Sequence, residues 1–178
     1  MSLDRLRELA PPPAEPVETG SPDAWGEVER TLGTALPSDY KTVTNLYGSG
    51  TFDEFLYLFN PFSKGEDGNL LHERDAVLEA YATSRKKSPD RYPLPPFPEP
   101  GGVLPAGRTE NGDELYWVTE GEPDAWPVML LESRGGRQER HATTITGFLA
   151  ALLGGELATS ILPEDVTRRR EHEFTALD

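Results

Sequence analysis

The residues best suited to metal or nucleophile chemistry are few in this chain of 178 residues. The three histidines, His72, His141 and His172, lie far apart, and no pair shows the i, i+4 spacing of a zinc-binding helix. The chain has no cysteine, which removes thiolate nucleophiles, disulfides and cysteine-based metal sites. We therefore expect no metal site and no cofactor.

The segment Gly48-Ser49-Gly50 is a candidate for a nucleophile turn or a phosphate loop. Both of those motifs need a strand before the glycines and a helix after them. Here a helical pattern precedes the glycines, which is the opposite order. We interpret the segment as the end of a helix.

Neighbouring carboxylates occur at three predicted turns, Asp53-Glu54, Glu66-Asp67 and Asp113-Glu114. Acid–base catalysis of the glycosidase type needs two carboxyl groups across a cleft, one of them with a raised pKa. At turns we expect solvent-exposed carboxylates with ordinary behaviour, so we predict that the protein is not an enzyme. A cleft that holds a carboxylate with a strongly shifted pKa would reopen the hydrolase hypothesis.

The stretch 109–133 holds seven acidic residues and no lysine or arginine. Most of them fall at hairpin ends, which predicts negative charge along one rim of a sheet. Trp117 and Trp126 lie in the same stretch, and tryptophan is favoured at interface centres, although core packing of Trp117 and a turn anchor at Trp126 are the alternatives. The candidate partner-binding residues are Glu110, Asp113, Glu114, Glu120, Glu122, Asp124 and Trp126.

The overall charge is strongly acidic, with 31 Asp and Glu against 17 Lys and Arg, a formal net charge of −14. This balance argues against nucleic-acid binding and against an anionic membrane surface. It fits either solubility through self-repulsion or attraction to a basic partner. The N-terminal residues have no apolar signal region and the longest apolar run, 148–153, is far too short for a membrane span, so we predict a cytoplasmic protein.

The first half of the chain reads mainly as helices. Residues 3–9 predict a short helix, followed by a proline-rich linker to Gly20. Ser21 and Pro22 start a helix that Gly33 ends, and a second helix restarts after Pro37 and ends at Gly48. Residues 52–62 predict a strand with two apolar faces, and residues 70–87 predict a long helix.

The second half reads as an antiparallel meander. A proline-rich stretch, 88–102, precedes a strand from Val103, and Asn111-Gly112 is the best hairpin signal in the chain. Strands at 114–119 and 128–132 and a polar edge strand at 138–142 follow, then a helix capped by Thr143 or Thr144. We predict an α+β fold, a mostly antiparallel sheet of about four to six strands covered by helices.

These patterns divide the chain into three parts. Residues 1–22 form an N-terminal segment and linker, residues 23–155 form the domain with a proline-rich insert at 88–102, and residues 156–178 form a tail. The patterns leave the oligomeric state open.

One block of this pattern resembles the SMI1/KNR4 family of the SUKH superfamily. It runs Trp25…Glu29…Leu32-Gly33…Leu36-Pro37-Ser38-Asp39-Tyr40-Lys41…Tyr47-Gly48-Ser49-Gly50, and the later hairpin, strand and closing helix fit too, over about residues 23–155. The resemblance implies structural roles for Trp25, Glu29, Leu36, Pro37, Tyr40, Gly48 and Gly50. It transfers no catalytic residue.

The resemblance also implies an α+β fold and a non-enzymatic role. Bacterial members of the family are mostly immunity proteins that neutralise a cognate toxin, often a basic nuclease, and an acidic surface suits such a partner. Fungal relatives act as scaffolds in cell-wall signalling. An immunity protein is therefore the first expectation, and an intracellular scaffold or regulatory protein without a toxin partner is the alternative.

Overall fold

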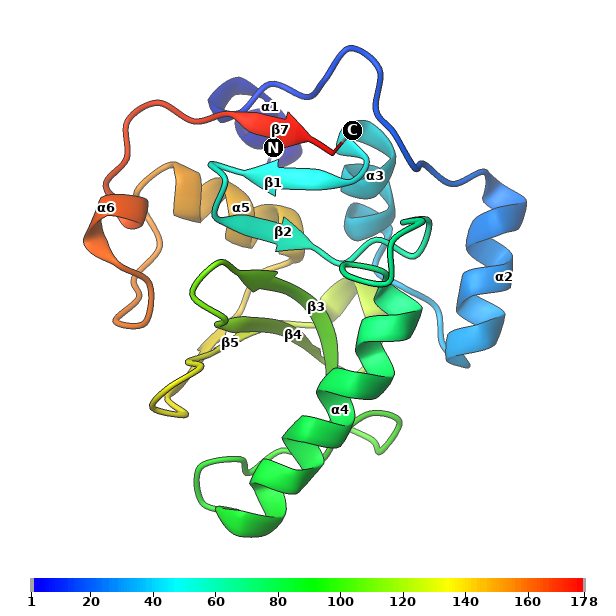
Figure 1. Ribbon diagram of the computed structural model, residues 1–178, viewed down its shortest axis with the longest axis vertical. Helices are drawn as coiled ribbons and strands as arrows, with labels where there is room; N and C mark the ends of the chain where they lie inside the picture. The colour runs from blue at the N-terminus through cyan, green and yellow to red at the C-terminus, as the bar shows by residue number, and fades with distance from the viewer. Residues whose placement is uncertain (1, 178) are drawn as a thin grey trace.

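An antiparallel sheet forms the centre of the fold, and the computed structural model describes residues 2–177 (Figure 1). Within these residues the sheet has seven strands in the order β6-β5-β4-β3-β2-β1-β7. The strands are β1 (Gly50–Phe52), β2 (Leu56–Leu58), β3 (Val103–Thr109), β4 (Glu114–Val118), β5 (Val128–Leu131), β6 (Gln138–His141) and β7 (Phe174–Ala176). The α+β prediction is confirmed, with a strand count slightly above the expected range.

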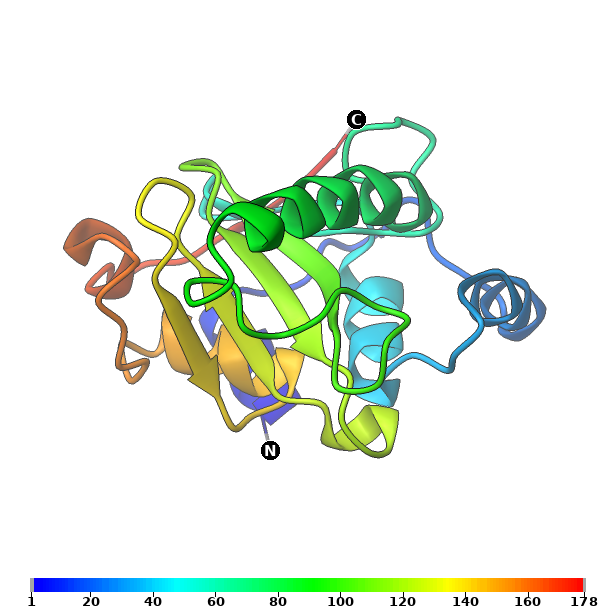
Figure 2. The same cartoon turned by 90° about the horizontal axis from the view of Figure 1, so that it is seen from below.

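Helices cover both faces of this sheet. They are α1 (Ser2–Leu9), α2 (Pro22–Leu32), α3 (Ser38–Tyr47), α4 (Leu70–Lys87), α5 (Ile145–Leu153), α6 (Glu164–Thr167) and the 3-10 turn η1 (Pro123–Ala125). Figure 2 shows α4 on one side of the sheet and α1 and α5 on the other. Helix α3 packs beside α5, and α2 lies at the end of the domain next to α3 (Figure 1).

Strand β4 shows why the centre of the sheet needs helices on both sides. Trp117 and Tyr116 are adjacent and therefore point to opposite faces, yet both are fully buried. The ring of Trp117 meets Tyr40 of α3 at 4.8 Å between centroids, and the ring of Tyr116 meets Tyr81 of α4 at 5.6 Å. The core packing that we considered for Trp117 is confirmed.

Local signals set the helix ends where the sequence predicts them. The Ser21 hydroxyl accepts from the amide of Ala24 at 3.2 Å, and Gly33 ends α2 in the left-handed conformation. The Thr144 hydroxyl accepts from the amide of Gly147 and caps α5. The polar strand β6 lies at one edge of the sheet, also as predicted.

The motif shared with SMI1/KNR4 proteins joins α2 and α3 to each other and to the sheet. Glu29 Oε1 accepts from the amide of Leu36 at 2.9 Å and from Lys41 Nζ at 2.7 Å. The ring of Trp25 packs edge-on against Tyr40, whose hydroxyl donates to the carbonyl of Phe59. These contacts fix the angle at which the chain turns after Leu32.

The prediction of one continuous strand over 52–62 is wrong. The chain reverses at Asp53 and Glu54, both with positive φ (58° and 54°), and Phe52 pairs with Leu56 across the turn. Glu54 is an unusual residue at positive φ, and no glycine or asparagine marks this turn in the sequence. A long-range contact of the Asp53 side chain, described below, holds the turn.

Both chain ends add elements to the domain. Leu6 of α1 is fully buried, and the Tyr47 hydroxyl donates to the carbonyl of Ala10 at 2.7 Å. Strand β7 pairs with β1, and the Phe174 ring packs against Tyr47 and Phe52. Both the N-terminal segment and the tail therefore supply apolar side chains to the same core, Leu6 from the first and Phe174 from the second.

Candidate partner-binding site

The seven candidate partner-binding residues do not share one rim of the sheet. Glu110, Asp113 and Glu114 lie where β3 turns into β4, and the other four lie in the connection from β4 to β5. These two turns are at opposite ends of β4, roughly 15 Å apart for a strand of this length. The expectation of a single acidic rim is wrong, because antiparallel strands place successive turns at alternate ends.

Two of the seven side chains are buried, and their hydrogen bonds stabilise the turns in which they lie. Asp113 is 4% exposed, and its carboxylate accepts from the amide of Ser133 at 3.0 Å and from the Thr109 hydroxyl at 3.2 Å. Trp126 is also 4% exposed, and its indole nitrogen donates to the carbonyl of Gly121 at 3.1 Å. Both side chains therefore form hydrogen bonds within the protein and expose little surface, and for Asp113 this is contrary to the exposed position that we expected for acidic residues at turns. Trp126 is the turn anchor that we considered as the alternative.

The acidic residues of the β4–β5 connection are exposed but differ in their partners. Glu120 Oε2 lies 2.6 Å from Arg140 Nη2, and this contact lowers the pKa of Glu120. Asp124 accepts from the amide of Ser38 at 2.6 Å, which lowers the pKa of Asp124. Within residues 2–177, Glu122 is exposed and forms no ion pair. Pairing with Arg140 reduces the field that Glu120 can direct at a partner.

Glu114 belongs to a charge network beneath α4. Arg108 Nη2 lies 3.1 Å from Glu73 Oε2 and 3.7 Å from Glu114 Oε1, and the Tyr116 hydroxyl donates to Glu114. Burial raises the pKa of Glu114, the charge of Glu73 adds to the rise, and Tyr116 and Arg108 oppose it. Both carboxylates bind the same nitrogen, which is an ion-pair network and not an acid and a base facing across a cleft. The network holds α4 on β3.

Asp53, like Asp113, is a carboxylate that the structure buries against expectation. Its Oδ2 lies 2.7 Å from Nδ1 of His172, its Oδ1 accepts from the amide of Glu173 at 3.0 Å, and Arg169 lies 3.5 Å from Oδ1. We call Asp53, Arg169 and His172 the C-terminal clasp. The His172 side chain is 2% exposed and has no access to a substrate, so the clasp fastens β7 to the β1–β2 turn.

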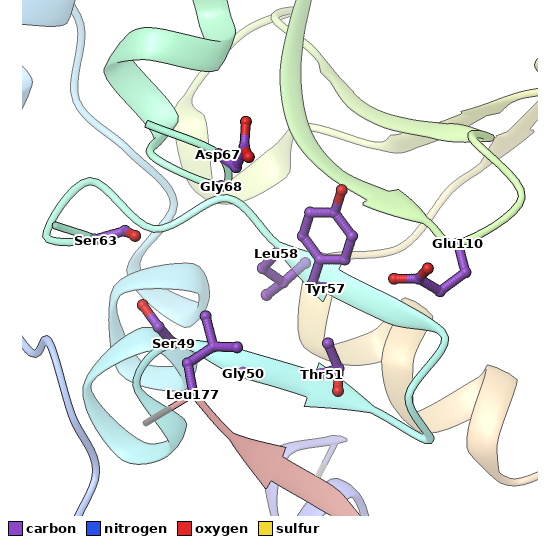
Figure 3. A pocket seen from close by; sticks show the side chains of 10 residues that line it. All are labelled: Ser49, Gly50, Thr51, Tyr57, Leu58, Ser63, Asp67, Gly68, Glu110 and Leu177. Carbon is purple, nitrogen blue, oxygen red and sulfur yellow. The ribbon is translucent and has the colours of Figure 1, made fainter. Parts of the chain in front are cut away.

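A groove opens where the sheet lacks a helical cover. Helix α4 lies over β3, and the same face of β2, β1 and β7 carries no helix (Figure 1). The groove has a volume of about 240 Å³ and is bordered by the loop before α4, the β3–β4 turn and the C-terminal residues. Its lining residues are Ser49, Gly50, Thr51, Tyr57, Leu58, Ser63, Asp67, Gly68, Glu110 and Leu177 (Figure 3).

The groove combines negative charge, hydroxyl groups and apolar surface. Figure 3 shows the Tyr57 ring standing between the carboxylates of Asp67 and Glu110. Leu177 is 52% exposed, and in the described part of the chain only Val17 is a comparably exposed large hydrophobic residue. Burial raises the pKa of Tyr57, and the nearby charge of Glu110 adds to the rise against the effect of Arg108. An apolar centre with a polar border is the usual anatomy of a protein interface.

Of the residues that line this groove, only Glu110 is among the partner-binding residues predicted from the sequence. The sequence patterns placed Tyr57 inside a buried strand, Asp67 in a solvated loop and Leu177 in a tail. These residues come together only through the sheet order, which brings β7 beside β1. No short motif in the sequence connects them.

Among residues 2–177, no group of three or more His, Cys, Asp or Glu side chains is arranged to hold a metal ion. None of the helices in that range is long and apolar enough to cross a membrane.

A seven-stranded antiparallel sheet between helical layers, with an acidic groove on its open face, defines an α+β domain. The chain belongs to the SMI1-KNR4 cell-wall family (SUKH_6), whose pattern matches residues 22–149, well over half of its length. The resemblance seen in the sequence is thereby confirmed. No curated protein and no solved structure matches the chain significantly.

Proposed function

We propose that this protein is a non-enzymatic binding module of the immunity type, which neutralises a cognate basic toxin in the cytoplasm. The observation that carries the proposal is the acidic groove on the open sheet face, in a chain of net charge −14 that belongs to the SMI1-KNR4 family. Opposite charges on two proteins speed their encounter and fix their relative orientation.

The exposed members of the acidic set steer the partner in this proposal, and the buried ones hold the turns. Glu110 belongs to the groove, and Glu120, Glu122 and Asp124 extend the negative field to the opposite end of β4. The exposed Leu177 and the ring of Tyr57 supply the apolar contact that charges alone do not give.

The test begins with capture of the partner from the native host, followed by rescue of growth. A basic toxin domain encoded beside this gene is expressed with and without the protein, and the proposal expects growth only with it. Rescue together with a tight complex of the two purified proteins supports the proposal. Failure to rescue growth from every captured or neighbouring toxin overturns it in favour of the scaffold alternative.

Matched charge variants then test the surface. Asp67→Asn with Glu110→Gln is expected to slow association at low salt several-fold and to flatten its salt dependence. The control is Glu79→Gln with Asp90→Asn, which removes the same two charges from exposed positions on α4 and just beyond its C-terminal end. Equal effects of the two double variants on the association rate would contradict a role for the groove.

A further inference from the structure

The groove on the open sheet face has the chemistry of a receptor for one cationic side chain. Its residues include two carboxylates, which only accept hydrogen bonds, and no lysine, arginine or histidine among the described residues that line it. At about 240 Å³ it is below the usual size of a pocket for a drug-sized ligand. It therefore suits part of a larger partner, such as one long side chain.

The nearest arginine of the protein itself, Arg108, lies beside Tyr57 on the neighbouring strand β3, but carboxylates beneath α4 hold its guanidinium group. Arg108 contacts Glu73 and Glu114 and lies 5.4 Å from the centre of the Phe59 ring, beneath α4. It is not among the residues that line the groove. The negative charge of Asp67 and Glu110 thus faces solvent, without an ion pair in the part of the chain that the structure describes.

The ring of Tyr57 favours arginine over lysine as the cationic side chain in this groove. It stands between Asp67 and Glu110 (Figure 3), so a group seated there meets an aromatic ring and two carboxylates at once. A guanidinium group is planar, stacks on aromatic rings and offers five donors to carboxylates, whereas an ammonium group is a strongly hydrated point charge. The aliphatic part of the same side chain would cover Leu58 or Leu177.

We infer that the groove receives an arginine side chain of a protein partner, with its guanidinium group at Tyr57 between Asp67 and Glu110. This inference rests on the proposed function in one respect, that the ligand belongs to a protein. It names the residue type that the partner must present, which family membership does not supply.

The experiment is a two-dimensional NMR titration of the full chain with acetyl-Gly-Arg-Gly-amide, in parallel with the lysine and citrulline versions of the peptide. Citrulline keeps the shape of arginine and removes its charge. We expect saturable shifts at Thr51, Tyr57, Gly68 and Glu110 with the arginine peptide, at least several-fold weaker binding of the lysine peptide and no saturation with citrulline.

Variants assign the binding to the groove. Asp67→Asn with Glu110→Gln, and separately Tyr57→Leu, are expected to remove the saturable shifts, whereas Tyr57→Phe and the control Glu79→Gln with Asp90→Asn retain them. The spectrum of each free variant reports whether it folds. Equal binding of citrulline and arginine, or shifts spread over the whole acidic surface, would overturn the inference.

The outcomes separate this inference from the proposed function. Growth rescue without saturable binding of the arginine peptide refutes the arginine site and leaves the immunity function standing. Saturable binding without rescue leaves the groove as an arginine receptor for a partner that is not a toxin.

Discussion

Asp39, at the start of α3, caps helix α5 through Thr146. Its Oδ2 accepts from the amide of Thr146 at 2.9 Å and from the Thr146 hydroxyl at 2.7 Å. Thr146 is 2% exposed, so water cannot easily replace these bonds. The carboxylate thus supplies a helix N-terminus 107 residues away in the sequence with the acceptor that it needs.

Removing that carboxylate is expected to destabilise the fold. We expect Asp39→Ala to lower the free energy of unfolding by about 1–3 kcal/mol, because the buried amide of Thr146 loses its acceptor. Urea unfolding followed by tryptophan fluorescence measures it. Thr42→Ala is the control, since this exposed hydroxyl bonds only the carbonyl of Ser38 at 2.8 Å, and its effect should stay within about 0.5 kcal/mol. Equal losses in both variants would refute the capping role.

The stabilisation from Glu29 should depend on pH in the acid range. Burial alone would raise the pKa of Glu29, but hydrogen bonds from Leu36 and Lys41 and the Lys41 charge outweigh it and lower the pKa below its ordinary value of 4.5. The folded state then binds the proton more weakly than the unfolded state. The stabilisation is complete above pH 4.5 and is lost as the pH falls through the folded-state pKa.

Comparison with Glu29→Gln isolates this effect. The free energy of unfolding of the unmodified protein minus that of the variant should be constant from pH 7 to about pH 5 and should shrink as the pH falls further. Urea unfolding at each pH provides both values. A difference that grows towards low pH would mean that the pKa is raised, contrary to the contacts of this carboxylate.

Gly48 and Gly33 both end helices with positive φ, and they differ in their surroundings. A Cβ at Gly48 would lie 2.1 Å from the carbonyl oxygen of Val17, whereas at Gly33 nothing lies within 4 Å. We expect Gly33→Ala to cost about 1–2 kcal/mol from the left-handed backbone alone. Gly48→Ala should cost clearly more, because residues near Val17 must also move. Thermal unfolding of the two variants measures the difference, and equal midpoints would contradict it.

Breaking the C-terminal clasp should release β7 before the rest of the sheet. His172→Ala leaves the buried carboxylate of Asp53 without its closest partner, at 2.7 Å. We expect faster amide hydrogen exchange at Leu177, whose amide donates to the carbonyl of Ser49, with β3 to β5 still protected. His72→Ala replaces an exposed histidine and is the control. Uniform loss of protection across the sheet would show that β7 is not a separate unit.

Helix α4 shows what regular periodicity can predict. Its residues 70–87 follow from apolar spacing and from basic residues in the last turn, both of which act within one or two turns of the helix. The hairpin at Asn111-Gly112 follows in the same way, although four residues, 110–113, separate its strands, with Gly112 at a φ of 83°.

The groove could not be predicted from local patterns, because its residues come together only in the folded sheet. Tyr57, Asp67, Glu110 and Leu177 come from β2, the loop before α4, the β3–β4 turn and the C-terminal segment. The sequence patterns did not distinguish one acidic turn from another. The antiparallel strands place Glu110 and Glu122 at opposite ends of β4. Composition alone gave the total charge, and topology decides where that charge lies.

The sequence by itself determined the family, the helices and the antiparallel meander, since these depend on contacts among residues a few positions apart. Only the tertiary structure decided that Asp53 and Asp113 are buried, that both chain ends join the core and that an open sheet face borders acidic residues. The physical reason is that burial and pairing depend on residues distant in sequence: Asp53 meets His172 across 119 positions, and no local pattern at either residue encodes that contact.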